Sequence, residues 1–111
     1  MKLAEQTCMP IKAGEPPLTG QEVGDLLHKV PLWTLQGTAI VREFRLDDFR
    51  QAMDFVNKAA DVANEQDHHP DILISYNKVR LTFTTHKING LSLNDFISAA
   101  KIDILADRLT V

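Results

Sequence analysis

The stretch DHHPDILISYNKVRLTFTTH, residues 67–86, has the clearest strand pattern in the chain. Apolar and polar side chains alternate on both sides of residues 77–78, which is the period of two half-buried strands. A two-residue turn at Asn77-Lys78 would place Tyr76 opposite Val79 in an antiparallel hairpin. We therefore predict that one face of this hairpin packs on the core, through Ile72, Ile74, Tyr76, Val79, Leu81 and Phe83.

Three of the four histidines of the chain lie at the two ends of this stretch. In the predicted register, His69 stands opposite His86 if the ladder extends that far, with Cβ atoms about 4.5–5.5 Å apart. His68 lies one residue earlier, with Asp67 beside it. Because imidazole exchanges protons near neutral pH, this cluster is typical of an acid/base site that acts on one small molecule.

Two other interpretations of the histidines stay open from spacing alone. The His-His-Pro run at residues 68–70 would also serve as a plain link between a helix and a strand, because Pro70 favours extended geometry at His69. Three histidines can also bind zinc and leave one position open for water, although the chain lacks the H-E-x-x-H pattern.

Three helices are predicted from their start signals. Residues 19–22 and 92–95 read Thr-x-x-Glu and Ser-x-x-Asp, which are capping boxes at the beginning of helices. Asp47 or Asp48 caps a third helix, whose apolar residues recur every three or four positions. That helix must end by about residue 67, before the proline.

A further hairpin is predicted around Gly37-Thr38, because glycine at the first position of a two-residue turn favours the II′ type. Its strands cover residues 32–36 and 39–45. The full order is then α-β-β-α-β-β-α. This order predicts an α+β fold of two layers, in which a four-stranded antiparallel sheet has its helices packed on one face.

The length of 111 residues suits a single domain. Residues 1–17 contain Gly14, Pro16 and Pro17 without a sustained period, so we expect an irregular N-terminal arm. We expect residues 18–111 to form a single folded domain. The arm holds Cys8, which is expected to be either an inert thiol or a reactive one.

Composition excludes several classes of protein. The formal net charge of −3 gives no general attraction for nucleic acid, and no window approaches the roughly 20 apolar residues of a membrane span. The N-terminal residues lack the apolar core of a secretory signal. The single cysteine rules out an internal disulfide and suits a reducing compartment, so we expect a cytoplasmic protein.

The same stretch resembles the pterin-4a-carbinolamine dehydratases, also called 4a-hydroxytetrahydrobiopterin dehydratases. The matching motifs are DHHPD, YNKV, TTH and NGLS, in order and at the spacing of the family, followed by Asp95. The similarity extends upstream through Trp33, AIVREFRL and DFRQAMDFVNKAADVA, and covers roughly residues 20–105. It implies an α+β fold with a saddle of four antiparallel strands, in agreement with the order of elements predicted from the residues.

The resemblance also implies a reaction. Family members are hydro-lyases that remove water from 4a-hydroxytetrahydropterin, the product of aromatic amino-acid hydroxylases, and give quinonoid dihydropterin in tetrahydrobiopterin recycling. They use no metal and no organic cofactor. The catalytic residues that it implies are His68, His69 and His86, with His68 and His86 as the acid/base pair.

Substrate-binding residues are implied by the same match. His69 would bind and orient the pterin, and the other binding residues would be Asp67, Thr85 and Asp95. Asp67 would also hold a histidine in the required tautomer. Asp95 closes a predicted capping box, which is an alternative reason for its presence. Asn64 departs from the family, which commonly has glutamate four residues before the first motif histidine.

Partners follow from the resemblance and from physical grounds. An open four-stranded sheet leaves two edges to be paired, so we expect a homodimer, or a tetramer. The alternative function is that of an interaction protein, because some family members are dimerisation partners of a homeodomain transcription factor and degenerate relatives assist enzyme assembly. Direct contact with nucleic acid or membrane is not expected.

Overall fold

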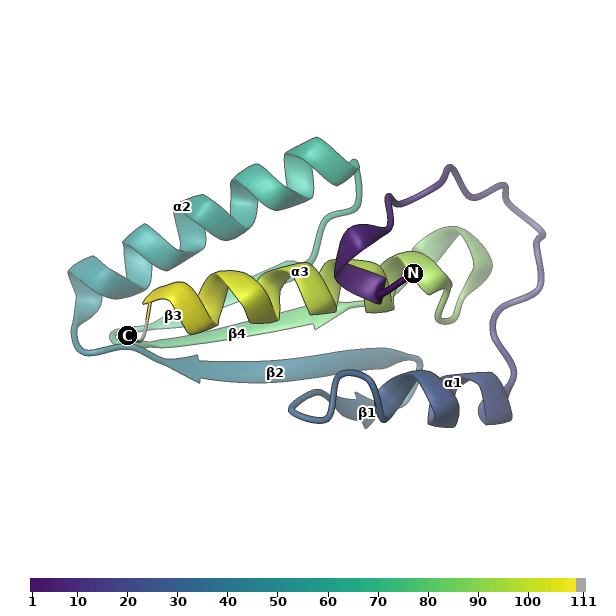
Figure 1. The fold of residues 1–111 in the computed structure, drawn as a ribbon, viewed down its shortest axis with the longest axis horizontal. Coiled ribbons are helices and arrows are strands. Elements are labelled where there is room, and N and C mark those ends of the chain that lie inside the picture. Colours follow the sequence, from purple (N-terminus) through teal and green to yellow (C-terminus); the bar gives the residue numbers. More distant parts are fainter. Residues whose placement is uncertain (110–111) are drawn as a thin grey trace.

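The computed structural model describes residues 1–109 of the chain, and the predicted order of helices and strands is confirmed. Two short 3-10 helices, which were not predicted, precede and interrupt this order. Figure 1 shows the arrangement. The elements are η1 (Leu3–Glu5), α1 (Gly20–Leu27), β1 (Thr34–Gln36), β2 (Ala39–Arg45), α2 (Phe49–Gln66), β3 (Asp71–Ser75), β4 (Lys78–Phe83), η2 (His86–Ile88) and α3 (Leu93–Leu109).

The helices begin where their caps predict. Thr19 and Glu22 form the complete capping box of α1, and the Asp48 side chain accepts a hydrogen bond from the Gln51 N–H at the start of α2. Asp67 ends α2 in the left-handed conformation, with φ of 52°. The helix therefore stops at the predicted position, immediately before the histidine motif.

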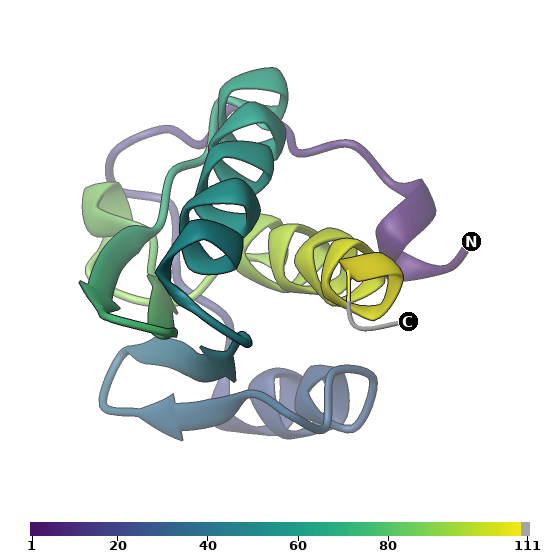
Figure 2. The ribbon, with the colours of Figure 1, turned by 90° about the vertical axis from the view of Figure 1, so that its left-hand side faces the viewer.

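The four strands form one antiparallel sheet in the order β1-β2-β4-β3. The first hairpin turns at the predicted residues, because Gln36 pairs with Ala39 and Gly37 has φ of 60°. All three α-helices lie on one side of the sheet, as Figure 2 shows. The predicted α+β fold with helices on one face is thus confirmed.

The predicted register of the second hairpin is wrong by two residues. Ser75 pairs with Lys78 and Ile74 with Val79, so the turn consists of residues 76–77. Tyr76 lies in this turn with φ of 53° and 66% of its surface exposed, instead of on the core face. The ladder of β3 begins at Asp71, so the strand pairing does not place His69 opposite His86.

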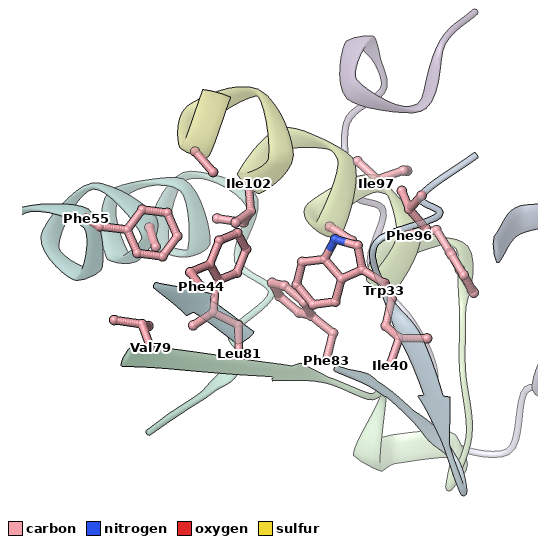
Figure 3. Close-up of a cluster of buried hydrophobic side chains, with 14 of the residues drawn as sticks. Trp33, Ile40, Phe44, Phe55, Val79, Leu81, Phe83, Phe96, Ile97 and Ile102 are labelled. Atoms are coloured by element: carbon pink, nitrogen blue, oxygen red, sulfur yellow. The ribbon is translucent and has the colours of Figure 1, made fainter. Parts of the chain in front are cut away.

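The core fills the space between the sheet and the helices. Trp33, Phe44 and Phe83 pack together, with Trp33 to Phe83 ring centroids 5.6 Å apart. Figure 3 shows these rings between the strands and α3. The other labelled members of the cluster are Ile40, Phe55, Val79, Leu81, Phe96, Ile97 and Ile102.

The N-terminal segment lies on the folded body. Leu3 of η1 is buried and belongs to the core cluster, and the segment then passes near the end of α2 before it reaches α1, as Figure 1 shows. Gly90 is buried so closely against this segment that an added Cβ would lie 2.6 Å from the Pro17 Cβ. The division into an arm and one domain at residue 18 stays a prediction. No helix within residues 1–109 has the length and apolar character needed to cross a bilayer.

Candidate active site

His68 is positioned by the end of α2. The left-handed residue before it turns the chain, and the His68 N–H donates to the Ala63 carbonyl at 3.2 Å. The imidazole then lies parallel to the Phe83 ring, with centroids 5.9 Å apart and an interplanar angle of 9°. Only 12% of the side chain is exposed, so the ring has a defined orientation.

A buried carboxylate contacts a ring nitrogen of His68. Asp95 Oδ1 lies 2.5 Å from His68 Nε2, and the Asp95 side chain has no exposed surface. Its second oxygen, Oδ2, accepts hydrogen bonds from the Ser92 N–H at 2.9 Å and the Thr85 hydroxyl at 2.8 Å. Buried carboxylates need such partners because desolvation of an unpaired charge is costly. Asp95, and not Asp67, is therefore the carboxylate that orients a histidine here.

His69 has a neutral partner. Its Nε2 lies 3.0 Å from Asn64 Oδ1, and both residues are exposed. Asn64 occupies the position at which the resembling family commonly has glutamate. The side chain at this position thus contacts a histidine of the motif, through an amide.

His86 is the first residue of η2, in the loop that connects β4 to α3. Thr85 and Gly90 form an isolated antiparallel bridge that closes this loop. Thr85 is buried and its hydroxyl lies 2.7 Å from the Ser92 hydroxyl, whereas His86 is exposed. The loop therefore anchors Thr85 to the start of α3 and presents His86 to solvent.

One cavity brings the three histidines together. It has a volume of about 360 Å³, and its lining includes His68, His69, His86, Asp67 and Thr85. Asp95 has no exposed surface, so it reaches this cavity through His68 and Thr85. The fourth histidine, His28, lies exposed at the end of α1.

The arrangement of the three histidines is suited to proton transfer. Within residues 1–109, no three His, Cys, Asp or Glu side chains are grouped closely enough to hold a metal ion, so the zinc hypothesis lacks a ligand set there. Three imidazoles around one cavity, one of them oriented by a carboxylate, can donate and accept protons on a bound molecule.

Sequence reasoning missed one wall of the cavity. Residues 8–11 of the N-terminal segment line it, as do Gln66 and Asn94. The position of Gln66 could have been noticed in the sequence, because it continues the buried face of α2. A polar side chain on a buried face needs a hydrogen-bond partner. The segment itself has no periodic pattern from which its position could be predicted.

Comparisons with known proteins show the family to which this chain belongs. The family model described as pterin 4 alpha carbinolamine dehydratase matches residues 16–105. A relative from Rubrobacter xylanophilus, named "Putative pterin-4-alpha-carbinolamine dehydratase", is 45% identical over 94% of this chain and 98% of its own length. A relative of the same name from Methylococcus capsulatus is 46% identical over 94% of this chain and 93% of its own length.

Two solved structures share the fold. A protein from Brucella melitensis described as "transcriptional coactivator/pterin dehydratase" has a TM-score of 0.77 and 36% identity, over 81% of this chain and 98% of that protein. A pterin dehydratase-like protein described as a RuBisCO assembly factor has a TM-score of 0.56 and 20% identity, over 67% of this chain and 86% of that protein. At 20% identity, the second likeness shows the fold alone.

Proposed function

Because this chain belongs to the pterin-4-alpha-carbinolamine dehydratase family, we propose that it removes water from 4a-hydroxytetrahydropterin to give quinonoid dihydropterin. The observation that supports this most is the single cavity lined by His68, His69 and His86, with Asp95 Oδ1 2.5 Å from the His68 imidazole. The reaction needs groups that exchange protons on two sides of one ring, and this cavity offers them.

The reaction needs one acid and one base. The C4a–O bond breaks as the N5 lone pair forms the C4a=N5 bond, an acid protonates the departing hydroxide, and a base takes the N5 proton. The Asp95 carboxylate favours a proton on His68 Nε2, which leaves the Nδ1 lone pair of the neutral ring free. His68 is therefore the base in this proposal.

His86 is the acid in this assignment. It is exposed, so water can restore its proton after each turnover. His69 orients the pterin together with Asp67 and Thr85, which also line the cavity. Asp95 acts as a positioning residue through His68, because its own surface is buried.

Kinetics test the proposal. Purified protein should accelerate the loss of chemically or enzymatically generated 4a-hydroxytetrahydropterin, and an unaltered rate with folded protein would refute it. The His86→Ala variant should lower turnover strongly, by roughly 10²-fold or more, with a native circular dichroism spectrum. Unfolding of this variant would instead indicate that His86 is a structural residue.

The biological setting follows from the substrate. The compound arises when an aromatic amino-acid hydroxylase consumes tetrahydropterin, so such an enzyme acts upstream and the product returns to the tetrahydrobiopterin pool by reduction. One cysteine in the chain is consistent with a reducing cytoplasm. No cofactor enters the proposed steps, because the protein groups supply both proton transfers.

A second candidate function is that of an interaction protein. The neighbour from Brucella melitensis, at 36% identity, is described as a coactivator as well as a dehydratase. A pulldown with a folded, inactive variant such as His86→Ala would separate the two functions. Retention of a specific partner by that variant would establish a role independent of catalysis.

Self-association is supported by the edge of the sheet. β3 is an edge strand, and it exposes 60% of Leu73 and 37% of Ile72. Such an apolar edge favours pairing with a second copy, which would form an isologous dimer.

A further inference from the structure

The aliphatic part of the cavity comes from the N-terminal segment. Residues 8–11, a cysteine, a methionine, a proline and an isoleucine, line it consecutively. The other lining residues are polar or ionisable: Gln66, Asp67, His68, His69, Thr84, Thr85, His86, Lys87 and Asn94. Binding sites for flat organic ligands combine apolar surface with a few polar groups, and here the two kinds of surface belong to different parts of the chain.

Two buried amides fix this segment in place. Asn94 Oδ1 accepts from the Met9 N–H at 2.9 Å, and Asn94 Nδ2 donates to the Met9 carbonyl at 2.7 Å. Gln66 Oε1 accepts from the Cys8 N–H at 2.8 Å. Asn94 and Gln66 are only 6% and 9% exposed, so their hydrogen bonds to the backbone are largely shielded from water.

The start of α3 connects the two walls of the cavity. Asn94 holds the N-terminal segment, and the next residue, Asp95, holds His68. Met9, whose backbone bonds to Asn94 and which lines the cavity, exposes 67% of its surface. A large apolar side chain that is exposed at the rim of a cavity is available to cover a ligand.

We infer that residues 8–11 form a substrate-contacting wall, in which Met9 and Ile11 cover the apolar surface of the pterin, and that Asn94 is the positioning residue for this wall. The inference rests on the proposed function and deepens it. It extends the site beyond the histidine motif to a segment that lies largely outside the matched family region, which begins at residue 16.

Affinity for an unreactive ligand tests the inference. Dihydrobiopterin would be titrated calorimetrically into the wild type and into Met9→Ala, Ile11→Ala and Asn94→Ala. Each variant should bind about 5- to 30-fold more weakly, and KM for the carbinolamine should rise more than kcat falls. Gln6→Ala is the matched control. Gln6 lies in the same N-terminal segment but does not line the cavity, and its side chain donates a hydrogen bond to the nearby Met1 carbonyl.

Cys8 provides a second readout that does not depend on turnover. It is the only cysteine in the sequence, it lines the cavity, and burial raises the pKa of its thiol. At mildly alkaline pH, bound dihydrobiopterin should slow its reaction with a thiol reagent severalfold, and Asn94→Ala should accelerate the reaction in the absence of ligand.

The outcomes separate this inference from the proposed function. Wild-type affinity in Met9→Ala, Ile11→Ala and Asn94→Ala, with ligand-independent labelling of Cys8, would overturn the wall while the dehydratase function stands. Failure of the wild type to bind dihydrobiopterin would overturn both.

Discussion

Asp95 contacts both the start of α3 and a histidine of the candidate site. One oxygen satisfies the Ser92 N–H at the start of α3 and the Thr85 hydroxyl, and the other orients His68. The sequence offered the helix cap and the site as alternative explanations for this residue. Because a carboxylate has two oxygens and several lone pairs, the buried side chain meets both requirements.

The Asp95→Asn variant should lose most of its activity. The amide is nearly isosteric, but it removes the negative charge and can turn an N–H toward His68 or Thr85. We expect turnover to fall by roughly 10²- to 10⁴-fold, with a native circular dichroism spectrum, because His68 loses its orientation and tautomer.

The matched control is Asn64→Ala, which removes the partner of the other motif histidine. The contact of Asn64 with His69 is exposed, so its loss should change turnover by less than about threefold. Near-normal turnover in Asp95→Asn would contradict the role given to Asp95.

The histidines of the candidate site could be predicted from the sequence. The spacing of His68, His69 and His86 in the sequence indicated a proton-transfer site, and the structure places all three at one cavity. The roles of Asn94 and Gln66 were not predictable, because each depends on contact with a segment more than fifty residues away in the chain. Neither hydrophobic periodicity nor a sequence motif predicts such a contact.

At the scale of elements, the second hairpin shows the limit of pattern reading. A shift by two residues leaves every side chain on the same face of a strand, so alternation alone cannot distinguish the two registers. The observed register is fixed by a distant contact: Asn77 receives the Leu46 N–H at its carbonyl and donates from its side chain to the Leu46 carbonyl. Helix starts and the first hairpin were predictable because their caps and turn glycine act locally.

Tyr76→Gly should stabilise the protein. Tyr76 has φ of 53°, a conformation that is strained for a residue with a bulky side chain, and its ring is largely exposed. Relief of this strain, less the entropy cost of glycine, should raise the free energy of unfolding by about 0.5–1 kcal/mol.

The control for this prediction is Ser75→Gly, one residue earlier in the strand. It should lower the free energy of unfolding by about 0.5–1 kcal/mol, because a strand residue of ordinary geometry gains flexibility in the unfolded state. Denaturant titration measures both variants. Destabilisation by Tyr76→Gly would show that the tyrosine ring makes a stabilising contact.

A polar link between the sheet and α3 predicts a pH dependence. Asp103 accepts hydrogen bonds from Trp33 at 2.8 Å and Arg42 at 2.5 Å. Burial nevertheless raises the pKa of the Asp103 carboxyl above its ordinary value of 3.8, more than these hydrogen bonds lower it. The folded state therefore binds this proton more readily than the unfolded state does, and the resulting stability is gained as the pH falls through the folded pKa.

The Asp103→Asn variant lacks this titration. As the pH is lowered from neutral toward 3.8, the unfolding free energy of the wild type should rise relative to that of the variant. Denaturant titrations at several pH values measure it, and other carboxylates cancel because both proteins contain them. A difference that moves toward the variant on acidification would contradict the raised pKa.

At the scale of the whole molecule, the site lies where separate parts of the chain meet. The end of α2, the start of α3, the loop with η2 and the N-terminal segment all line the cavity or hold its lining. The apolar core between sheet and helices fixes these ends relative to one another, and Phe83 extends that core beneath His68. The fold therefore assembles acid/base groups that are far apart in sequence.

The free edge of β3 predicts self-association. Light scattering after size-exclusion chromatography should give at least twice the chain mass of 12.5 kDa. Leu73→Asp should shift the protein toward the monomer, because it places a charge on the exposed apolar edge. Leu35→Asp is the control, since Leu35 is 45% exposed on the opposite edge strand, β1. A monomeric wild type would contradict the prediction.

Titration of the histidine ring protons with dihydrobiopterin, followed by NMR, tests the central claim most directly. The ring signals of His68, His69 and His86 should shift together with one common Kd, while the signals of His28, exposed at the end of α1, should stay unchanged. Shifts with different Kd values, or no shift in any of the three, would contradict a shared pterin site.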